Sequence, residues 1–338
     1  MTSLLPDFTP ARTRVGARRR AVAALAASAM LLTACSGEDG DSQDPQGTAD
    51  AATMSRTSPL TGKVLPEQPG HPILAVKIDN SGSAQQVGLG KADMVVEELV
   101  EGGITRLATF FYSSVPSDAG PVRSMRATDI GIVAPLKAVL VASGGAAPTW
   151  KRVREANIKT VSEGGRGFYR GAGSAPYNLF VDMDKLVAPL DRVKSVPEPY
   201  LPFGDAPMPK GKPAKRFTAV FSQASDSQFE FRGGRYVNTD GYAGRGGDFR
   251  PDTVLVLRVR VGLAGYRDPS GYPVPETRFT GKGAATIFHG GRMITGTWSK
   301  NGLEAPLTLR TKAGELQLPP GKVRIELVPN GTGSLRVG

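Results

Sequence analysis

The stretch from Ile73 to Gly82 reads ILAVKIDNSG, an apolar run that ends in turn-forming residues. A short apolar run bounded by a turn is typical of a buried strand. Asp79 and Asn80 then fall at the carboxyl end of this strand, where open α/β sheets bind their ligands. Asp79 is therefore a candidate general base, metal ligand or hydrogen-bond acceptor. The alternative is a turn in which its side chain bonds the neighbouring backbone.

The segments that follow this run alternate between strand and helix patterns. Apolar runs predict strands over residues 94–101, 104–112 and 138–142, and Gly102-Gly103 joins the first two as a hairpin. Spacing and composition predict helices over residues 125–136, 149–159 and 184–190. The alternation predicts an α/β domain over residues 59–195.

A change of composition separates this domain from the rest of the chain. Six prolines fall between Pro197 and Pro213, so residues 196–215 are expected to form a stiff linker or a long surface loop. Beyond it, short apolar runs separated by glycine-rich turns predict strands over 219–221, 229–231, 253–261, 285–289, 293–298, 307–309 and 323–327. This pattern predicts a mostly β second domain over residues 216–330.

The first 35 residues have the pattern of a signal peptide. Five arginines precede an apolar stretch, Ala21 to Thr33, that is too short to span a membrane. The sequence Leu32-Thr33-Ala34-Cys35 resembles the bacterial lipobox, and Cys35 is the only cysteine of the chain. We expect Cys35 to be acylated and to become the first mature residue, with a buried free cysteine as the alternative. The general and the twin-arginine export routes both stay open.

Charge and composition limit the partners of the mature chain. The net charge is +11, and it falls to +7 without the leader, which carries five arginines and one aspartate. On the outer side of the membrane, anionic wall polymers, lipid headgroups or an envelope protein are the expected partners, not nucleic acid; a basic surface that only aids solubility is the alternative. Residues 36–58 are polar and are expected to form a flexible tether that reaches roughly 26 Å.

A series of motifs resembles the YerB-like bacterial lipoproteins, a family of two domains of unknown function. The motifs occur in the same order along the chain: PLTG (59–62), VKIDN (76–80), GLGKAD (88–93), EELVEGGITR (97–106), GPVRSMR (120–126), GKGA (281–284), GTWSK (296–300) and LPPGK (318–322). They cover nearly the whole mature chain.

The resemblance implies a sandwich-type N-terminal α/β domain, a smaller C-terminal domain and attachment to the cell envelope. It implies no activity. Where relatives tend to have histidine, this chain has Tyr177, so a histidine base or ligand is absent there. The Trp-Ile pair that often follows the late Pro-Gly-Lys is replaced by Arg324-Ile325.

Glu97 and Glu101 are candidates for a pair of catalytic carboxylates. In a strand, Glu97 and Glu101 share one face and lie roughly 13 Å apart. A glycosidase needs carboxylates about 5 to 9.5 Å apart, so either glutamate would instead have to pair with Asp79 or Asp93. The alternative is a solvated strand face, or an ion pair with Arg106 across the hairpin.

The segment from Gly120 to Arg126 is the strongest candidate for anion binding. Pro121 suits an early helical turn, and Ser124 can cap a helix. Arg123 and Arg126 then lie on one side of that turn, where two guanidinium groups bind phosphate or carboxylate. The alternative is a structural network in which both pair with Glu97, Glu101 or Asp129.

Known catalytic motifs are absent from the sequence. It has two histidines far apart and no HExxH, Walker A or Gly-x-Ser-x-Gly motif, so no metal and no cofactor is expected. The leading hypothesis is a lipid-anchored extracytoplasmic protein that binds an anionic ligand or wall polymer in a polar cleft. The alternatives are an envelope-polymer hydrolase or transferase that uses Asp79 and a glutamate, and a scaffold without catalysis. The expected cleft contains Asp79, Asn80, Glu97, Glu101, Arg106, Arg123, Ser124 and Arg126.

Overall fold

The computed structural model describes residues 56–190 and 196–338. The signal peptide, the lipobox with Cys35 and most of the expected tether lie outside these residues. Residues just before Pro59 already belong to the folded body, because Thr57 bridges to Val64 and Ser58 is fully buried. Within the described residues, no helix is long and apolar enough to cross a membrane.

The first half of the chain contributes five strands to a large sheet. They are β1 (Leu74–Asn80), β2 (Met94–Leu99), β3 (Thr105–Phe111), β5 (Val139–Ala142) and β6 (Thr160–Ser162). The predicted hairpin is confirmed, because β2 and β3 pair antiparallel. Strands β1, β5 and β6 are parallel neighbours, and α3 (Ala147–Glu155) connects β5 to β6.

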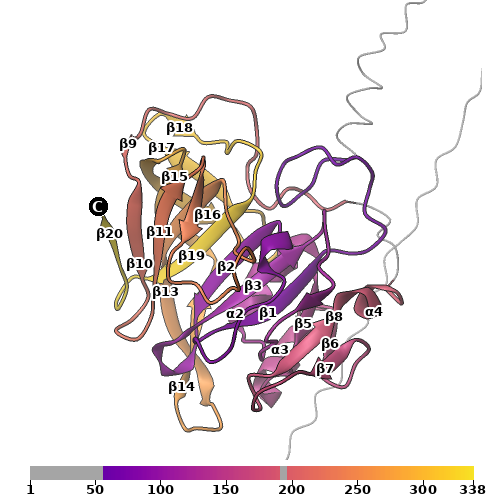
Figure 1. Ribbon diagram of the computed structural model, residues 1–338. Helices are drawn as coiled ribbons and strands as arrows, with labels where there is room; N and C mark the ends of the chain where they lie inside the picture. The colour runs from indigo at the N-terminus through magenta and orange to yellow at the C-terminus, as the bar shows by residue number, and fades with distance from the viewer. Residues whose placement is uncertain (1–55, 191–195) are drawn as a thin grey trace, which may run out of the picture. The chain divides into compact units, whose positions relative to one another are not determined.

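The second half continues the same sheet, although the sequence predicts its strands as a separate domain. Its members are β13 (Thr253–Arg267), β15 (Gly281–His289), β16 (Arg292–Lys300), β17 (Thr308–Thr311), β18 (Gly314–Glu315) and β19 (Val323–Pro329), with β9 (Lys212–Pro213) and β14 (Pro273–Arg278) at the side. Strand β19 lies parallel to β2, from Val323 opposite Met94 to Glu326 opposite Glu97. The two halves are therefore joined strand to strand in one sheet of 13 strands (Figure 1).

Two smaller sheets complete the fold. One contains β12 (Arg235–Asn238), β11 (Asp226–Arg232), β10 (Arg216–Val220) and β20 (Ser334–Val337), and the other contains β4 (Asp118–Ala119), β8 (Leu179–Asp182) and β7 (Phe168–Arg170). The four-stranded sheet packs on the large sheet, because Phe217 and Phe229 share a core with Val254, Val256 and Phe288.

Alternation along β1 places its side chains in different cores. Ala75 belongs to the first core, whereas Leu74, Val76 and Ile78 belong to the second. Lys77 is on the Ala75 side of the strand, since side chains two residues apart share a face. Three hydrophobic cores lie within the described residues, and these residues form a single compact unit.

The three predicted helices are present but shorter than expected, and the described chain is mostly β. They are α2 (Thr128–Val133), the 3-10 turn η3 (Ala134–Leu136), α3 and α4 (Met183–Val187), with the further 3-10 turns η1 (Leu89–Lys91) and η2 (Glu101–Gly103). The helix predicted from residue 125 begins only at Thr128. The α/β character of the first half therefore rests mainly on β5, α3 and β6, and its sandwich-type packing stays a prediction.

The proline-rich segment packs against the body of the protein. Tyr200 and Leu201 are buried in the first core, and the Tyr200 N–H donates to the Pro59 carbonyl at 2.9 Å. Phe203 forms a bridge with Leu318. Tyr200 and Leu201 are therefore not part of a free linker, whereas residues 205–207 are exposed, as expected for a surface loop.

The β13–β14 hairpin reaches from the second half onto the helices of the first. The Thr277 N–H donates to Thr128 Oγ1 at 3.0 Å, at the start of α2. Arg152 of α3 donates twice to Glu276, at 2.8 and 2.6 Å. These contacts fix α2 and α3 beside the end of the sheet at which the candidate site lies.

Candidate functional site

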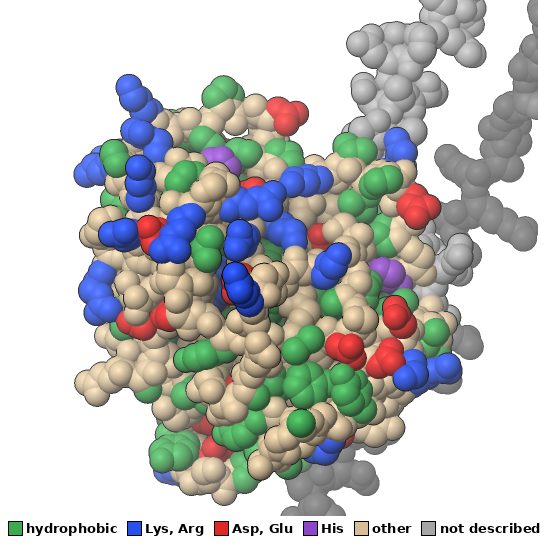
Figure 2. Space-filling model, in the orientation of Figure 1, with side chains coloured by type: hydrophobic (Ala, Val, Ile, Leu, Met, Phe, Trp, Pro, Cys, Tyr) green, Lys and Arg blue, Asp and Glu red, His purple; other side chains and the backbone are tan. Residues whose placement is uncertain are grey.

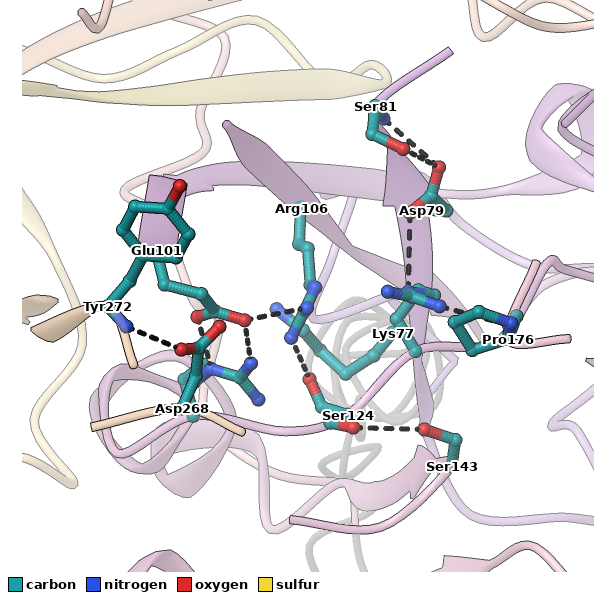
Figure 3. A network of polar contacts seen from close by, with 12 residues as sticks. Lys77, Asp79, Ser81, Glu101, Arg106, Ser124, Ser143, Pro176, Asp268 and Tyr272 are labelled. Carbon is teal, nitrogen blue, oxygen red and sulfur yellow. Dashed lines mark hydrogen bonds and ion pairs between the residues drawn. The ribbon is translucent and has the colours of Figure 1, made fainter. Parts of the chain in front are cut away.

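Asp79 lies at the carboxyl end of β1, and polar groups contact both oxygens of its side chain. Its Oδ2 accepts hydrogen bonds from Ser81, from the N–H at 3.1 Å and from the hydroxyl at 2.7 Å (Figure 3). Arg123 Nε lies 3.3 Å from Asp79 Oδ1. The local turn bond considered from the sequence is thus present, together with an ion pair that the turn alone does not require.

Arg123 is fixed in place while part of its side chain stays accessible. Its guanidinium donates to the Pro176 carbonyl at 2.9 Å and lies 4.6 Å from the centre of the Tyr177 ring. The side chain is 13% exposed. Nε has no hydrogen bond in either Arg123 or Arg106, but Arg106 and Arg126 each donate to a carboxylate, whereas Arg123 has only an ion pair of 3.3 Å.

Arg106 and Arg126 both bind the carboxylate of Glu101. Arg126 Nε donates to Glu101 Oε2 at 2.8 Å, and Arg106 donates to Glu101 Oε1 at 3.0 Å. Burial would raise the pKa of Glu101, but the hydrogen bond from Arg126 and the charges of both arginines outweigh it and lower that pKa to about 2. Burial and the nearby Arg126 charge lower the pKa of Arg106 to about 10.

The expected helical turn that carries Arg123 and Arg126 does not form, so the two arginines separate. Arg123 contacts Asp79 and Arg126 contacts Glu101, each from extended chain before α2. Ser124 does not cap a helix. Its carbonyl accepts from Arg106 at 2.9 Å, and its hydroxyl lies 3.1 Å from that of Ser143. The ion pair with Glu101 is the structural alternative considered for Arg126.

Glu97 and Glu101 lie on opposite sides of the sheet, contrary to the expectation of a shared face. Glu97 pairs with Leu107, whose side chain is in the second core. Glu101 instead bonds Arg106, which lies opposite Glu98 on the other face. The strand ends at Leu99, and the turn η2 with Gly102 at φ 71° interrupts the alternation.

Glu97 and Asn80 belong to the contact between the two halves of the chain. The Asn80 amide donates to Glu97 Oε1 at 2.9 Å, and the Ser227 hydroxyl donates to Oε2 at 2.8 Å. Arg324 of β19 also donates to Glu97 and to Glu326. Glu97 is completely buried, so it is out of reach of a substrate.

A buried triad lies at the same end, and the sequence pointed only to its member Asp129, as a partner of the arginines. Lys77 Nζ lies 2.6 Å from Glu98 Oε1 and 2.8 Å from Asp129 Oδ1, and all three side chains are fully buried. Burial and the Asp129 charge raise the pKa of Glu98 to about 7, against the lowering effect of Lys77. The signal was present in the sequence, since Lys77 interrupts an otherwise apolar strand.

Arg324 and Glu326 were also missed as members of this polar network. They alternate with Val323, Ile325 and Leu327, a pattern that places charges on one face of a strand. Burial raises the pKa of Glu326 well above its ordinary value, although the Arg324 charge opposes this. Arg324 and Glu326 interrupt an otherwise apolar strand, and this pattern could have indicated a buried polar network.

The loop between β5 and α3 lies beside Arg123. The Ser143 N–H donates to the Arg123 carbonyl at 3.0 Å, and the Met125 N–H donates to the Gly144 carbonyl at 2.9 Å. The first turn of α3 has no side-chain hydrogen bond at its cap. Arg123, the loop from Ser143 and this helix end therefore lie together at the carboxyl edge of β1 and β5.

The aromatic residues near this edge have different roles. Tyr177 stacks under Arg123, Trp150 packs partly buried against the first core, and Tyr169 donates to Asp118 at 2.8 Å. Among the described residues, no group of three or more His, Cys, Asp or Glu side chains is arranged to hold a metal ion.

Comparison with known proteins places this arrangement in a family. Residues 60–195 match the N-terminal domain, and residues 217–325 the C-terminal domain, of a protein family of unknown function, DUF3048. The chain belongs to this family. The resemblance inferred from the motifs is confirmed.

A relative with a curated name is "Putative lipoprotein YerB" of Bacillus subtilis. It is 39% identical over 111 residues, which are 31% of this chain and 30% of that protein. This match therefore covers less than a third of the relative's length. A crystal structure of YerB from the same organism has the same fold, with a TM-score of 0.67, 20% identity and coverage of 83% of this chain and 99% of the solved one.

Proposed function

We propose that this protein is a lipoprotein, lipidated at Cys35 and held on the extracytoplasmic face of the cell membrane, that binds an anionic ligand or wall polymer through Arg123. The name of the Bacillus relative supports the lipid anchor, as does the lipobox around Cys35. The binding site comprises Arg123, Tyr177 and the loop from Ser143 to α3.

The incomplete pairing of Arg123 carries the proposal. Arg106 and Arg126 are used to neutralise Glu101 within the protein. Arg123 has one ion pair of 3.3 Å, stays partly exposed and is held rigid by Pro176 and Tyr177. A guanidinium fixed at the carboxyl edge of parallel strands, beside a helix N-terminus, is well placed to receive a phosphate or carboxylate.

The carboxylates do not favour the hydrolase alternative. Asp79 is paired with Arg123 and Ser81, and Glu97 is buried on the opposite face of the sheet. Glu101 has a pKa of about 2 and is therefore a poor proton donor or acceptor near neutral pH. No observation favours catalysis here over binding.

A thermal-shift panel tests the proposal. Residues 56–338 would be melted with muropeptides, wall teichoic acid fragments, phosphosugars and nucleotides. A ligand at 100 times its Kd stabilises the folded protein by about 2.7 kcal/mol. We expect at least one anionic compound to raise the Tm, and Arg123→Ala to abolish that rise.

Arg154→Ala is the matched control, because it removes an exposed arginine of α3 and makes the same change in net charge. It should bind as the wild type does. A panel without any shift, or a shift that survives in Arg123→Ala, contradicts the proposal.

A further inference from the structure

A second cationic surface lies at the opposite edge of the sheet from Arg123. Lys91, Arg250 and Lys322 each come shortly before one of the strands β2, β13 and β19. Because these three strands are parallel neighbours, the residues before them lie at the same edge. We call Lys63, Lys91, Arg235, Arg250 and Lys322 the basic edge. Figure 2 shows Lys and Arg side chains gathered across the middle of the face in view.

Contacts link the members of the basic edge. Lys322 Nζ donates to the Gly90 carbonyl, next to Lys91, at 2.9 Å. It also lies 5.6 Å from the ring of Phe249, next to Arg250. Burial lowers the pKa of Lys322, and the charges of Arg235 and Lys63 add to this effect, against Asp93 and Asp252.

Most of these charges are not neutralised by the protein. Lys63, Lys91 and Arg250 are exposed, and neither they nor Lys322 form an ion pair within the described residues. The acidic neighbours are already engaged. Asp252 pairs with Arg235 at 3.1 Å. Asp93 is buried and accepts from Tyr112 and Ser113.

The start of the described chain lies beside this surface. Thr57 bridges Val64, which follows Lys63 in the sequence. Twenty residues separate Cys35 from Arg56, and a chain of that length spans roughly 25 Å on average if it is flexible, as the sequence predicts. A lipid on Cys35 would therefore keep the basic edge close to the headgroups of the membrane.

We propose that the basic edge docks on the anionic phospholipid headgroups of the membrane that holds the anchor. The proposal rests on the lipid anchor proposed above but not on the Arg123 site. Separate exposed cations on one edge suit many headgroups in a plane, and each Lys or Arg near an anionic surface strengthens binding severalfold. The chain leaves this same edge, which favours a membrane over a wall polymer as the partner.

Vesicle co-sedimentation tests the proposal. Residues 56–338 hold the three cores described above, and the solved YerB structure matches 83% of the chain, so this part is tested without the leader. Vesicles contain phosphatidylglycerol and phosphatidylcholine in equal amounts, or phosphatidylcholine alone. We expect binding to the anionic vesicles that Lys63→Glu/Lys91→Glu weakens about tenfold or more, and that high salt abolishes.

Arg166→Glu/Lys282→Glu is the matched control. It makes the same change in net charge at exposed residues that lie toward the other edge, after β6 and at the start of β15. This pair and Arg123→Ala should bind vesicles like the wild type. Equal loss in both double variants, no binding to anionic vesicles, or binding to purified wall teichoic acid instead would overturn the proposal. None of these results depends on the ligand of Arg123.

Discussion

Eight charged side chains meet at one end of β1, β2 and β3, and they balance in sign. The cations are Lys77, Arg106, Arg123 and Arg126, and the anions are Asp79, Glu98, Glu101 and Asp129. Burying a charge without a partner costs several kcal/mol, which explains why each of them has one. The balance also explains why a buried arginine in this cluster need not be a ligand-binding group.

The pKa of Glu98 makes stability depend on pH. It is about 7 in the folded protein against 4.5 for a free glutamate, so between these values the folded state retains a proton that the unfolded state has lost. The free energy of unfolding should therefore decrease as pH rises from about 4.5 to 7, by about 1–3 kcal/mol. Urea denaturation across this range measures the slope.

Glu98→Gln is the control for this pH dependence, because the amide keeps the shape and does not titrate. The decrease between pH 4.5 and 7 should become smaller in this variant. An equal slope in wild type and Glu98→Gln would show that Glu98 is not the titrating group. Glu101, with its pKa of about 2, acts in the opposite sense, and its stabilisation is lost only as pH falls below about 4.5.

Strands with strong apolar patterns could be predicted from the sequence, whereas short or interrupted strands could not. The run around Val76 and the hairpin around Gly102 follow from local pattern alone. Strands β6 to β8 have three or four residues each and too few apolar positions to be recognised. Glu101 reaches Arg106 because the turn η2 changes the direction of its side chain. The alternation of side chains along a strand does not predict such a change.

Close packing explains why glycine occupies position 283 of the GKGA motif, and this can be tested. The Trp298 indole N–H donates to the Arg258 carbonyl at 3.0 Å across this position. A Cβ on Gly283 would lie 2.3 Å from the Arg258 carbonyl oxygen and 2.6 Å from Trp298 Nε1. Gly283→Ala should lower the free energy of unfolding by about 1–3 kcal/mol, as measured by chemical denaturation.

Gly302→Ala serves as the comparison, because a Cβ there has no atom within 4 Å. Its free energy of unfolding should stay close to that of the wild type. If both alanine variants are equally stable, the close approach of β15 to Arg258 is not a constraint.

Strands β19 and β2 join the two halves of the chain, and local sequence does not predict this pairing. These parallel neighbours are more than 200 residues apart, and Glu97 contacts Ser227 and Arg324 from the second half. A sequence pattern can show that both strands are buried, but not that they are adjacent. The proline-rich segment looked like a boundary because its composition changes, whereas Tyr200 packs into the core.

The shared sheet predicts that both halves unfold together. The chain has two tryptophans, and they report on different halves: Trp150 in α3 and Trp298 in β16. Trp150→Phe and Trp298→Phe each leave one reporter. The two fluorescence transitions in urea should have the same midpoint after correction for the stability of each variant. Two separate midpoints would mean that the halves unfold independently.

Arg123 and Arg126 are expected to differ in role, Arg123 binding a ligand and Arg126 stabilising the fold. Melting Arg123→Ala and Arg126→Ala, with and without the anionic compound found in the panel, separates the two roles. We predict that Arg126→Ala loses about 3 kcal/mol, because Glu101 keeps only Arg106 as an ionic partner, and still responds to the compound. Arg123→Ala should also lose stability, because the buried Asp79 carboxylate keeps only Ser81 as a polar partner, but it alone should lose the response. If the rise in Tm is lost in Arg126→Ala and persists in Arg123→Ala, then Arg126 binds the anion and Arg123 does not.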